Sequence, residues 1–183
     1  MMINAYASGY FPMAEPDEDG QIYWYLPEVR ALLPIDSLHI PRSLAKVIRQ
    51  GRFQLFRNRD FDAIIRHCAD RDETWLSPEL VEVFMRLHRE GWAHSVGAWQ
   101  GDRLVGGVYG LALGRAFFAE SMFHLETDAS KVALVGLVDW LRSQEFELLD
   151  IQFMTEHLRR FGAFEITADA YQERLDHALL AFD

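Results

Sequence analysis

Two polar side chains interrupt an otherwise apolar run in the last quarter of the chain. In FELLDIQFMTEHL, residues 146–158, Asp150 and Gln152 stand among Leu, Ile, Phe and Met. Residues two apart on a β-strand point to the same side, so a strand here would place this carboxylate beside this amide. Burying an unpaired charge is costly, and Asp150 therefore needs either a partner or an opening.

These residue types could take a proton from an amine. Glu120, in FFAESMF, is a second acid within a predicted strand. Two acids and an amide in inner strands could hold a protonated amine and accept its proton, which the amine must lose before it can attack an acyl group. We therefore expect Asp150 to face a crevice in which it meets an entering ammonium group. The residues alone leave open the alternative, a structural Asp150 bonded to backbone amides or to an Arg of a neighbouring element.

Strands and helices must position these side chains, and their order follows from hydrophobic periodicity. The segment 93–123 has short alternating or apolar runs broken at glycine turns, which predicts a meander of antiparallel strands. Helical spacing over 128–144 leads directly into a strand over 146–154, and a helix that joins two strands of one sheet is a crossover. Further helices are expected at 39–51, 60–70, 77–91, 155–162 and 168–182, with Ser77 and Thr155 as caps, and a last strand at 163–166.

Composition narrows the class of protein. A chain of 183 residues with 50% hydrophobic residues can bury one core of ordinary size. The single cysteine, Cys68, excludes an internal disulfide, and the scattered histidines give no zinc spacing, so no metal site is expected. The first residues, MMINAYASGYFPM, contain neither a basic leader nor an apolar run long enough to span a bilayer. We expect a cytoplasmic protein with no membrane contact.

Positive charge is concentrated in one short region. The formal net charge of −10 argues against a general affinity for nucleic acid. Residues 39–59, however, contain six of the 18 Lys and Arg residues and no Asp or Glu. On a helix, Arg42, Lys46 and Arg49 would share one face, opposite an apolar face. A solvated charged face is the simpler interpretation, but the absence of acidic neighbours favours a surface that binds phosphates.

Six blocks of sequence, taken in order, resemble one known family. GYFPM, HIPRSL, TWLSPEL, LVGGVYGLALGRAFFAESMF, DASKVAL and DIQFMTEHLRRFGAFEI are similar to the leucyl/phenylalanyl-tRNA–protein transferases, from about Gly9 to about Tyr171. The resemblance implies transfer of Leu or Phe, and of Met less well, from aminoacyl-tRNA to the N-terminal Arg or Lys of an acceptor protein. This reaction forms a peptide bond and creates a degradation signal. No cofactor is implied, and a monomer is expected.

The same resemblance implies a fold and its division into domains. The expected fold is α/β (α+β), with a GNAT-like acetyltransferase core whose mixed, mostly antiparallel sheet is flanked by helices. This core would occupy residues 28–183. A small N-terminal domain precedes the core in the family, and residues 1–27 would be a reduced remnant of it.

Site residues follow by matching positions. Gln152 would bind the incoming α-amine and help to deprotonate it, while Asp150 orients the amide and Glu120 lies near the aminoacyl group. Val108 and Phe117 would line the apolar pocket for the Leu or Phe side chain. The other substrate-binding residues would be Trp75, which stacks near the terminal adenosine, and Met122, Met13 and Thr155. The acceptor stem of the tRNA would contact Arg42, Lys46, Arg49 and Arg52.

Two other functions compete with this one. An acyl-CoA-dependent N-acetyltransferase would need a glycine-rich turn to hold the pyrophosphate, whereas the matching segment, HLETDASKVAL, contains no glycine. A non-catalytic tRNA-binding or protein-binding paralogue is suggested by the short N-terminal region. Met13 stands where many members of the family have Trp, and the pocket for the tRNA end is expected to differ there. The presence of Asp150, Gln152 and Glu120 argues against that paralogue.

Overall fold

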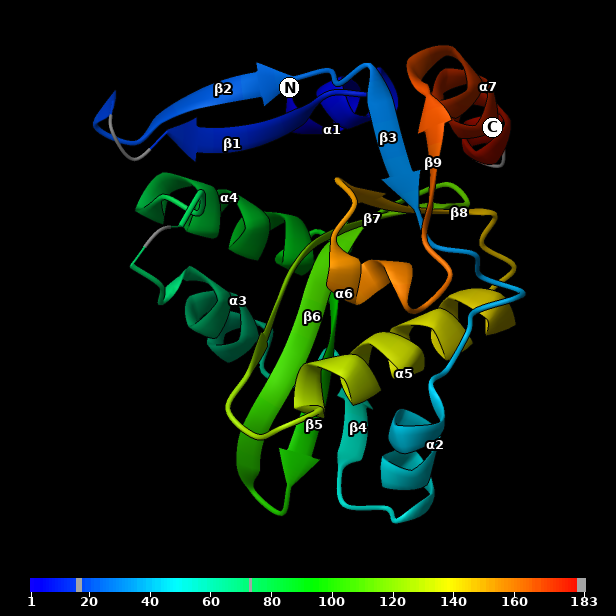
Figure 1. Ribbon diagram of the computed structural model, residues 1–183. Coiled ribbons are helices and arrows are strands. Elements are labelled where there is room, and N and C mark those ends of the chain that lie inside the picture. The colour runs from blue at the N-terminus through cyan, green and yellow to red at the C-terminus, as the bar shows by residue number, and fades with distance from the viewer. Residues whose placement is uncertain (16–17, 73, 181–183) are drawn as a thin grey trace.

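A seven-stranded sheet forms the centre of the computed structural model, which describes residues 1–15, 18–72 and 74–180 (Figure 1). Its strand order is β4-β5-β6-β7-β8-β3-β9. The bounds are β3 Val29–Leu32, β4 Gln54–Arg57, β5 Ala93–Gln100, β6 Arg103–Leu113, β7 Ala116–His124, β8 Leu148–Gln152 and β9 Phe164–Thr167. Among these strands only β7 and β8 run parallel. The expected α/β class with a mostly antiparallel sheet is therefore confirmed.

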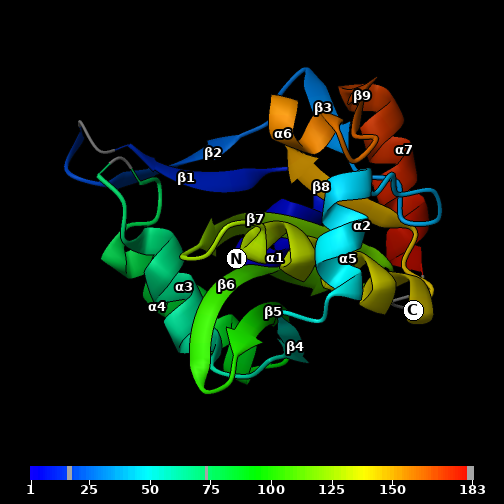
Figure 2. The same cartoon turned by 60° about the horizontal axis from the view of Figure 1, so that its bottom comes forward.

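Helix α5, Ala129–Ser143, makes the crossover that parallel strands require. It covers one face of the sheet, and α3, Phe61–Ala69, and α4, Pro78–Arg89, cover the other (Figure 2). Successive residues of a strand point to opposite faces, so each strand supplies both cores. Val108 and Phe117 belong to the core beside α5, whereas their neighbours Tyr109 and Phe118 belong to the core beside α3 and α4.

Three further helices complete this part of the chain. They are α2 Arg42–Arg49, α6 Glu156–Arg159 and α7 Ala168–Leu179. The predicted caps are confirmed, since the Ser77 and Thr155 hydroxyls accept hydrogen bonds from backbone N–H groups of α4 and α6. The helix expected over 168–182 is described only up to residue 180, and its last residues lie outside the described part of the chain.

The N-terminal region contains elements that the sequence patterns do not predict. Helix α1, Met2–Ala7, precedes a hairpin of β1, Phe11–Glu15, and β2, Gln21–Tyr25, which forms a sheet of its own. The chain then enters the main sheet as β3, between β8 and β9. The division of the chain at residue 27 stays a prediction.

Two absences hold for the described residues. None of the described helices combines the length and the apolar character needed to cross a bilayer. The described part of the chain also contains no group of three or more His, Cys, Asp or Glu side chains placed to hold a metal ion.

Candidate functional site

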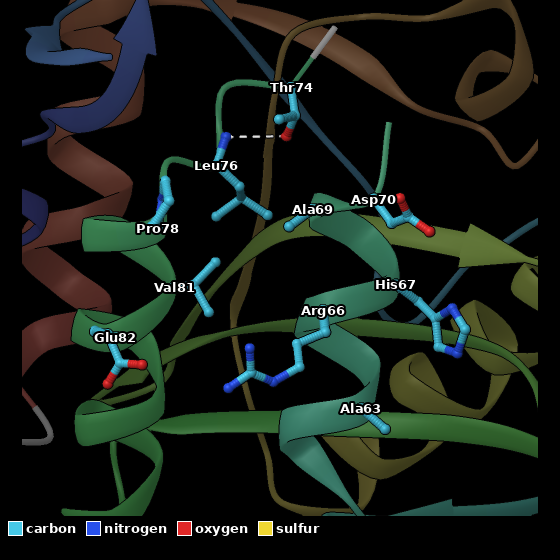
Figure 3. A pocket seen from close by; sticks show the side chains of 10 residues that line it. All are labelled: Ala63, Arg66, His67, Ala69, Asp70, Thr74, Leu76, Pro78, Val81 and Glu82. Atoms are coloured by element: carbon cyan, nitrogen blue, oxygen red, sulfur yellow. Dashed lines mark hydrogen bonds between the residues drawn. The ribbon is translucent and has the colours of Figure 1, made fainter. Parts of the chain in front are cut away.

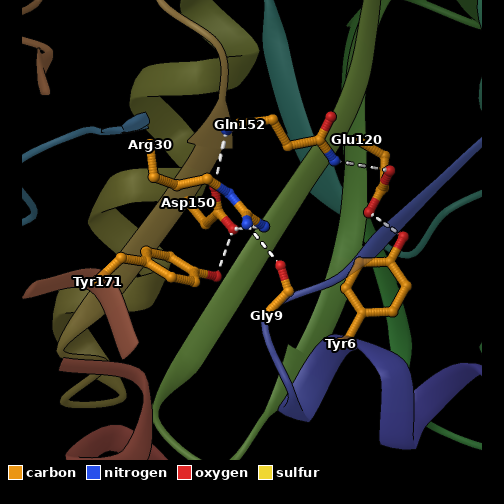
Figure 4. A network of polar contacts seen from close by, with 7 residues as sticks. All are labelled: Tyr6, Gly9, Arg30, Glu120, Asp150, Gln152 and Tyr171. Carbon is orange, nitrogen blue, oxygen red and sulfur yellow. Dashed lines mark hydrogen bonds and ion pairs between the residues drawn. The ribbon is translucent and has the colours of Figure 1, made fainter. Parts of the chain in front are cut away.

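Asp150 lies in the middle of a buried network of polar contacts (Figure 4). Its side chain is completely buried, and its carboxylate accepts four hydrogen bonds. Arg30 donates two, from Nε to Oδ1 at 3.2 Å and from Nη2 to Oδ2 at 2.7 Å. The Tyr171 hydroxyl donates to Oδ2 at 2.6 Å, and the backbone N–H of Gln152 donates to Oδ1 at 2.7 Å.

The expectation that Asp150 faces a crevice and meets an ammonium group is therefore wrong. The structural alternative is the correct one, because an Arg of the neighbouring strand β3 neutralises the carboxylate. A buried carboxylate is tolerated when its charge is paired and its acceptors are filled, and both conditions hold here. Asp150 can therefore affect a reaction only indirectly, by positioning the residues to which it is hydrogen-bonded.

Glu120 occupies an irregular position in β7. In the pairing of β6 with β7, Tyr109 opposes Ser121 and Gly110 opposes Ala119, so Glu120 is the extra residue of a β-bulge. Bulges bend a strand and redirect a side chain, and they are frequent beside active sites. The Glu120 carboxylate is almost fully buried, and it accepts a hydrogen bond from the Tyr6 hydroxyl at 2.5 Å and one from Gln152 Nε2 at 3.3 Å.

The surroundings of Glu120 change its acidity. Burial raises the pKa of Glu120 to about 8, and the negative charge of Asp150 raises it too, while the hydrogen bonds from Tyr6 and Gln152 and the charge of Arg30 act in the opposite direction. Burial also raises the pKa of Tyr6 well above its ordinary value, so the phenol remains a donor. A carboxylate with a raised pKa accepts a proton more readily than an ordinary carboxylate does.

Gln152 ends β8 in a strained conformation. Its φ is +68°, a left-handed value that costs a non-glycine residue about 1–2 kcal/mol. The hydrogen bond from its own backbone N–H to Asp150 holds it there. The side-chain amide is almost fully buried, and its Nε2 donates to Glu120, which leaves Oε1 as the acceptor.

The residues predicted to line an apolar pocket lie on one face of the sheet. Val108 and Phe117 are completely buried beside α5, in the same core as Leu137 and Leu149. The Phe117 ring covers Gly110, where an added Cβ would come within 2.5 Å of the ring. Met122 is the cross-strand partner of Val108, so these two are also brought together. Their contact with an aminoacyl side chain stays a prediction.

Three other predicted substrate residues lie in two places. Met13 and Trp75 lie close together, because the backbone N–H of Ala14 donates to the Trp75 carbonyl at 3.1 Å. Thr155 caps α6, three positions after Gln152 in the chain. Beside Trp75 a cavity of about 770 Å³ opens between α3 and α4, with Thr74 and Leu76 in its wall (Figure 3). Neither Glu120 nor Gln152 lines this cavity, so it is separate from the polar network.

The four cations of the predicted tRNA surface are all exposed. Arg42, Lys46 and Arg49 project from α2, whose Leu44 is buried on the other side, and Arg52 follows the helix. Within the described residues none of the four forms an ion pair. Their charge is therefore not neutralised by the protein itself.

Sequence reasoning missed the residues that hold the network together, which are Tyr6, Gly9, Arg30 and Tyr171. One signal was present for Arg30, which stands next to ALLP in an apolar run. The argument that Asp150 needs a partner applies equally to this arginine. Nothing in the sequence indicated that the two would pair, because 120 positions separate them.

Comparisons with known proteins agree on one family. A family model described as leucyl/phenylalanyl-tRNA protein transferase matches residues 32–176, and a model of the N-terminal domain of that family matches residues 1–28. The curated leucyl/phenylalanyl-tRNA–protein transferase of Paramagnetospirillum magneticum is 51% identical, over 98% of this chain and 88% of the relative. That of Maricaulis maris is 49% identical, over 98% and 85%.

Solved structures give only weak likenesses. An aminoglycoside acetyltransferase from an uncultured soil metagenomic sample, solved in complex with sisomicin, aligns with a TM-score of 0.48 and 12% identity, over 62% of this chain and 86% of that one. L-PGS from Bacillus licheniformis aligns with a TM-score of 0.48 and 12% identity, over 86% and 54%. Likenesses of this strength say nothing about activity.

Proposed function

The chain belongs to the leucyl/phenylalanyl-tRNA protein transferase family, and we infer that it is an aminoacyltransferase that moves Leu or Phe from aminoacyl-tRNA to a protein. The observation that carries this inference is the family match over residues 32–176, together with relatives about 50% identical over nearly the whole chain. It argues against both a non-catalytic binding protein and an acyl-CoA-dependent N-acetyltransferase.

The finer points of the reaction are proposals that rest on the sequence resemblance. The acceptor is a protein whose first residue is Arg or Lys, and the product carries a degradation signal. Met is transferred too, although less well than Leu or Phe. An apolar pocket distinguishes similar side chains by only about 1–3 kcal/mol per methylene, so some transfer of Met is expected. The enzyme acts as a monomer in the cytoplasm. The exposed cations of α2 and Arg52 bind the phosphates of the acceptor stem.

The reacting groups are Glu120 and Gln152. The positive charge of the incoming α-ammonium group favours the ionised form of the Glu120 carboxyl. The ammonium group donates a hydrogen bond to Gln152 Oε1 and transfers one proton to the Glu120 carboxylate. The neutral nitrogen then attacks the aminoacyl carbonyl carbon. A C–N bond forms, the C–O bond to the terminal ribose breaks, and the ribose oxygen leaves with the second proton of the nitrogen.

The strand arrangement supports this placement. β7 pairs with β8 only from Ala116 to Phe118, opposite Leu148 to Asp150. Beyond these residues the ladder stops, and the Gln152–Glu120 side-chain bond connects the two strands instead. Ligands of open α/β sheets bind outside the carboxyl ends of the strands, where neighbouring strands separate.

Asp150 acts in this proposal as a positioning residue rather than as a base. The Asp150 carboxylate is out of reach of a substrate. It accepts a hydrogen bond from the backbone N–H of Gln152, and this bond holds Gln152 in the left-handed conformation that ends β8. The demand on catalysis is modest, because an aminoacyl ester is already activated. Holding amine and ester in contact can supply up to roughly 7–11 kcal/mol.

One assay tests the activity and the choice of acceptor. The purified chain is incubated with labelled Leu-tRNA and a peptide that begins with Arg, or with a matched peptide that begins with Ala. Label is expected in the first peptide only. Absence of label from both would refute the transferase function, and equal labelling would refute the selection of Arg. A parallel reaction with labelled acetyl-CoA should transfer nothing.

A further inference from the structure

Arg30 is buried and makes three side-chain hydrogen bonds and two contacts with aromatic rings. It lies on β3, between the ranges 1–28 and 32–176 that match the two family models, and only 1% of it is exposed. Its guanidinium group lies between two aromatic rings, with Cζ 4.8 Å from the centroid of Phe11 and 4.3 Å from that of Tyr171. This contact involves β1 on one side and α7 on the other.

The edges of the same guanidinium bind two further parts of the chain. Two of its nitrogens donate to the Asp150 carboxylate on β8. The third, Nη1, donates to the carbonyl oxygen of Gly9 at 2.6 Å, just after α1. Arg30 therefore connects the N-terminal segment to β8, two regions far apart in the sequence (Figure 4).

Each of the two regions that Arg30 connects provides one hydrogen bond to Glu120. Helix α1 carries Tyr6, which donates to one carboxylate oxygen, and β8 ends at Gln152, which donates to the other. We propose that Arg30 is a positioning residue for the transfer reaction, which fixes the N-terminal segment against β8 so that Tyr6 and Gln152 meet Glu120 together. This proposal rests on the transferase function inferred above.

The geometry requires an arginine rather than any cation. A guanidinium group is planar, so its faces can stack on rings while its edge makes two parallel hydrogen bonds to a carboxylate. A lysine ammonium is a point charge on a flexible stem, and it has no planar face to lie between Phe11 and Tyr171. Arg30→Lys would keep the charge beside Asp150 and lose the simultaneous connection to Gly9. It therefore separates the positioning role from charge neutralisation.

The first test compares Arg30→Lys with wild type and with Arg115→Lys, a control in an exposed ion pair with Glu147. Transfer from Leu-tRNA to the Arg peptide is measured at a temperature where all three proteins are folded. We expect kcat of Arg30→Lys to fall about 10-fold to 100-fold, the scale of a misplacement of roughly 1 Å, with KM for Leu-tRNA unchanged. The control should behave like wild type.

Amide hydrogen exchange supplies the second readout, because the proposal states which segment is released. Residues 1–9 should exchange faster in Arg30→Lys than in wild type or in Arg115→Lys. Wild-type kcat in folded Arg30→Lys would overturn the proposal, and so would a loss of kcat with unchanged exchange in residues 1–9. A wild-type protein that transfers nothing would instead refute the transferase function.

A second variant covers the case in which Arg30→Lys does not fold. Arg30→Met combined with Asp150→Asn replaces the buried ion pair by neutral groups of similar size, a change that proteins often tolerate. We expect this double variant to fold with a much reduced kcat. Wild-type kcat in it would show that Arg30 serves stability alone, and would overturn the proposal.

Discussion

Replacing Glu120 by Gln removes one titrating carboxyl group from the buried network and nearly preserves its shape. The Gln oxygen can still accept the hydrogen bond from Tyr6. The pKa of the Glu120 carboxyl is raised, chiefly by burial, from 4.5 to about 8 in the folded protein. The folded state therefore binds a proton that the unfolded state has already released, and the free energy of unfolding depends on pH.

The sign and size of this effect follow from the two pKa values. Because the pKa of Glu120 is raised in the folded state, proton binding at Glu120 stabilises the fold fully below pH 4.5. This stabilisation is lost as the pH rises through about 8. Each pKa unit corresponds to about 1.4 kcal/mol, so the whole change amounts to roughly 5 kcal/mol. The unfolding free energy of wild type minus that of Glu120→Gln should fall by this amount between acidic and mildly alkaline pH.

Urea unfolding of both proteins at a series of pH values measures this difference. Glu147→Gln is a control of opposite sign: desolvation acts to raise the pKa of Glu147, but hydrogen bonds from His177 and Arg115 lower it overall. Its contribution to stability should be lost as the pH falls. A wild-type minus Glu120→Gln difference that stays constant across the pH range would refute the buried, proton-binding carboxyl on which the proposed reaction depends.

Three further variants test other parts of the site. Asp150→Ala leaves Arg30 as an unpaired buried cation, so we expect the free energy of unfolding to fall by about 3–5 kcal/mol. Transfer should be nearly abolished, and undiminished turnover would show that Asp150 positions nothing. Charge reversal at Arg49 and Arg52 should weaken tRNA binding and flatten its dependence on salt, and an unchanged salt slope would exclude this surface. Phe117→Ala should lower the free energy of unfolding by about 3–5 kcal/mol, which thermal unfolding measures. It should also loosen the choice of aminoacyl group, which a panel of charged tRNAs would reveal.

Local sequence patterns predicted most of the elements from residue 39 onward. Periodic apolar spacing indicated the helices that became α2 to α7, and glycine turns indicated the β5–β7 meander. The cap residues Ser77 and Thr155 were identified correctly, because a cap depends only on a few adjacent residues. The patterns did not predict α1 or β1 to β4, whose short segments contain too few residues for a period to be recognised.

The sequence also located the polar groups of the site without giving their contacts. It showed that Asp150, Gln152 and Glu120 interrupt apolar strands, and in the structure all three side chains are buried. It did not distinguish a crevice from a partner, and the crevice that we expected beside Asp150 is filled by Arg30 and Tyr171.

The sequence by itself determined most of the helices and strands from residue 39 onward, because apolar periodicity is a local property, and six blocks of sequence indicated the family. Only the tertiary structure decided that β3 lies between β8 and β9, and hence that Arg30 neutralises Asp150 while Glu120 is left to Tyr6 and Gln152. The physical reason is that a buried charge takes the partner that strand order brings within about 3 Å, however distant in the chain.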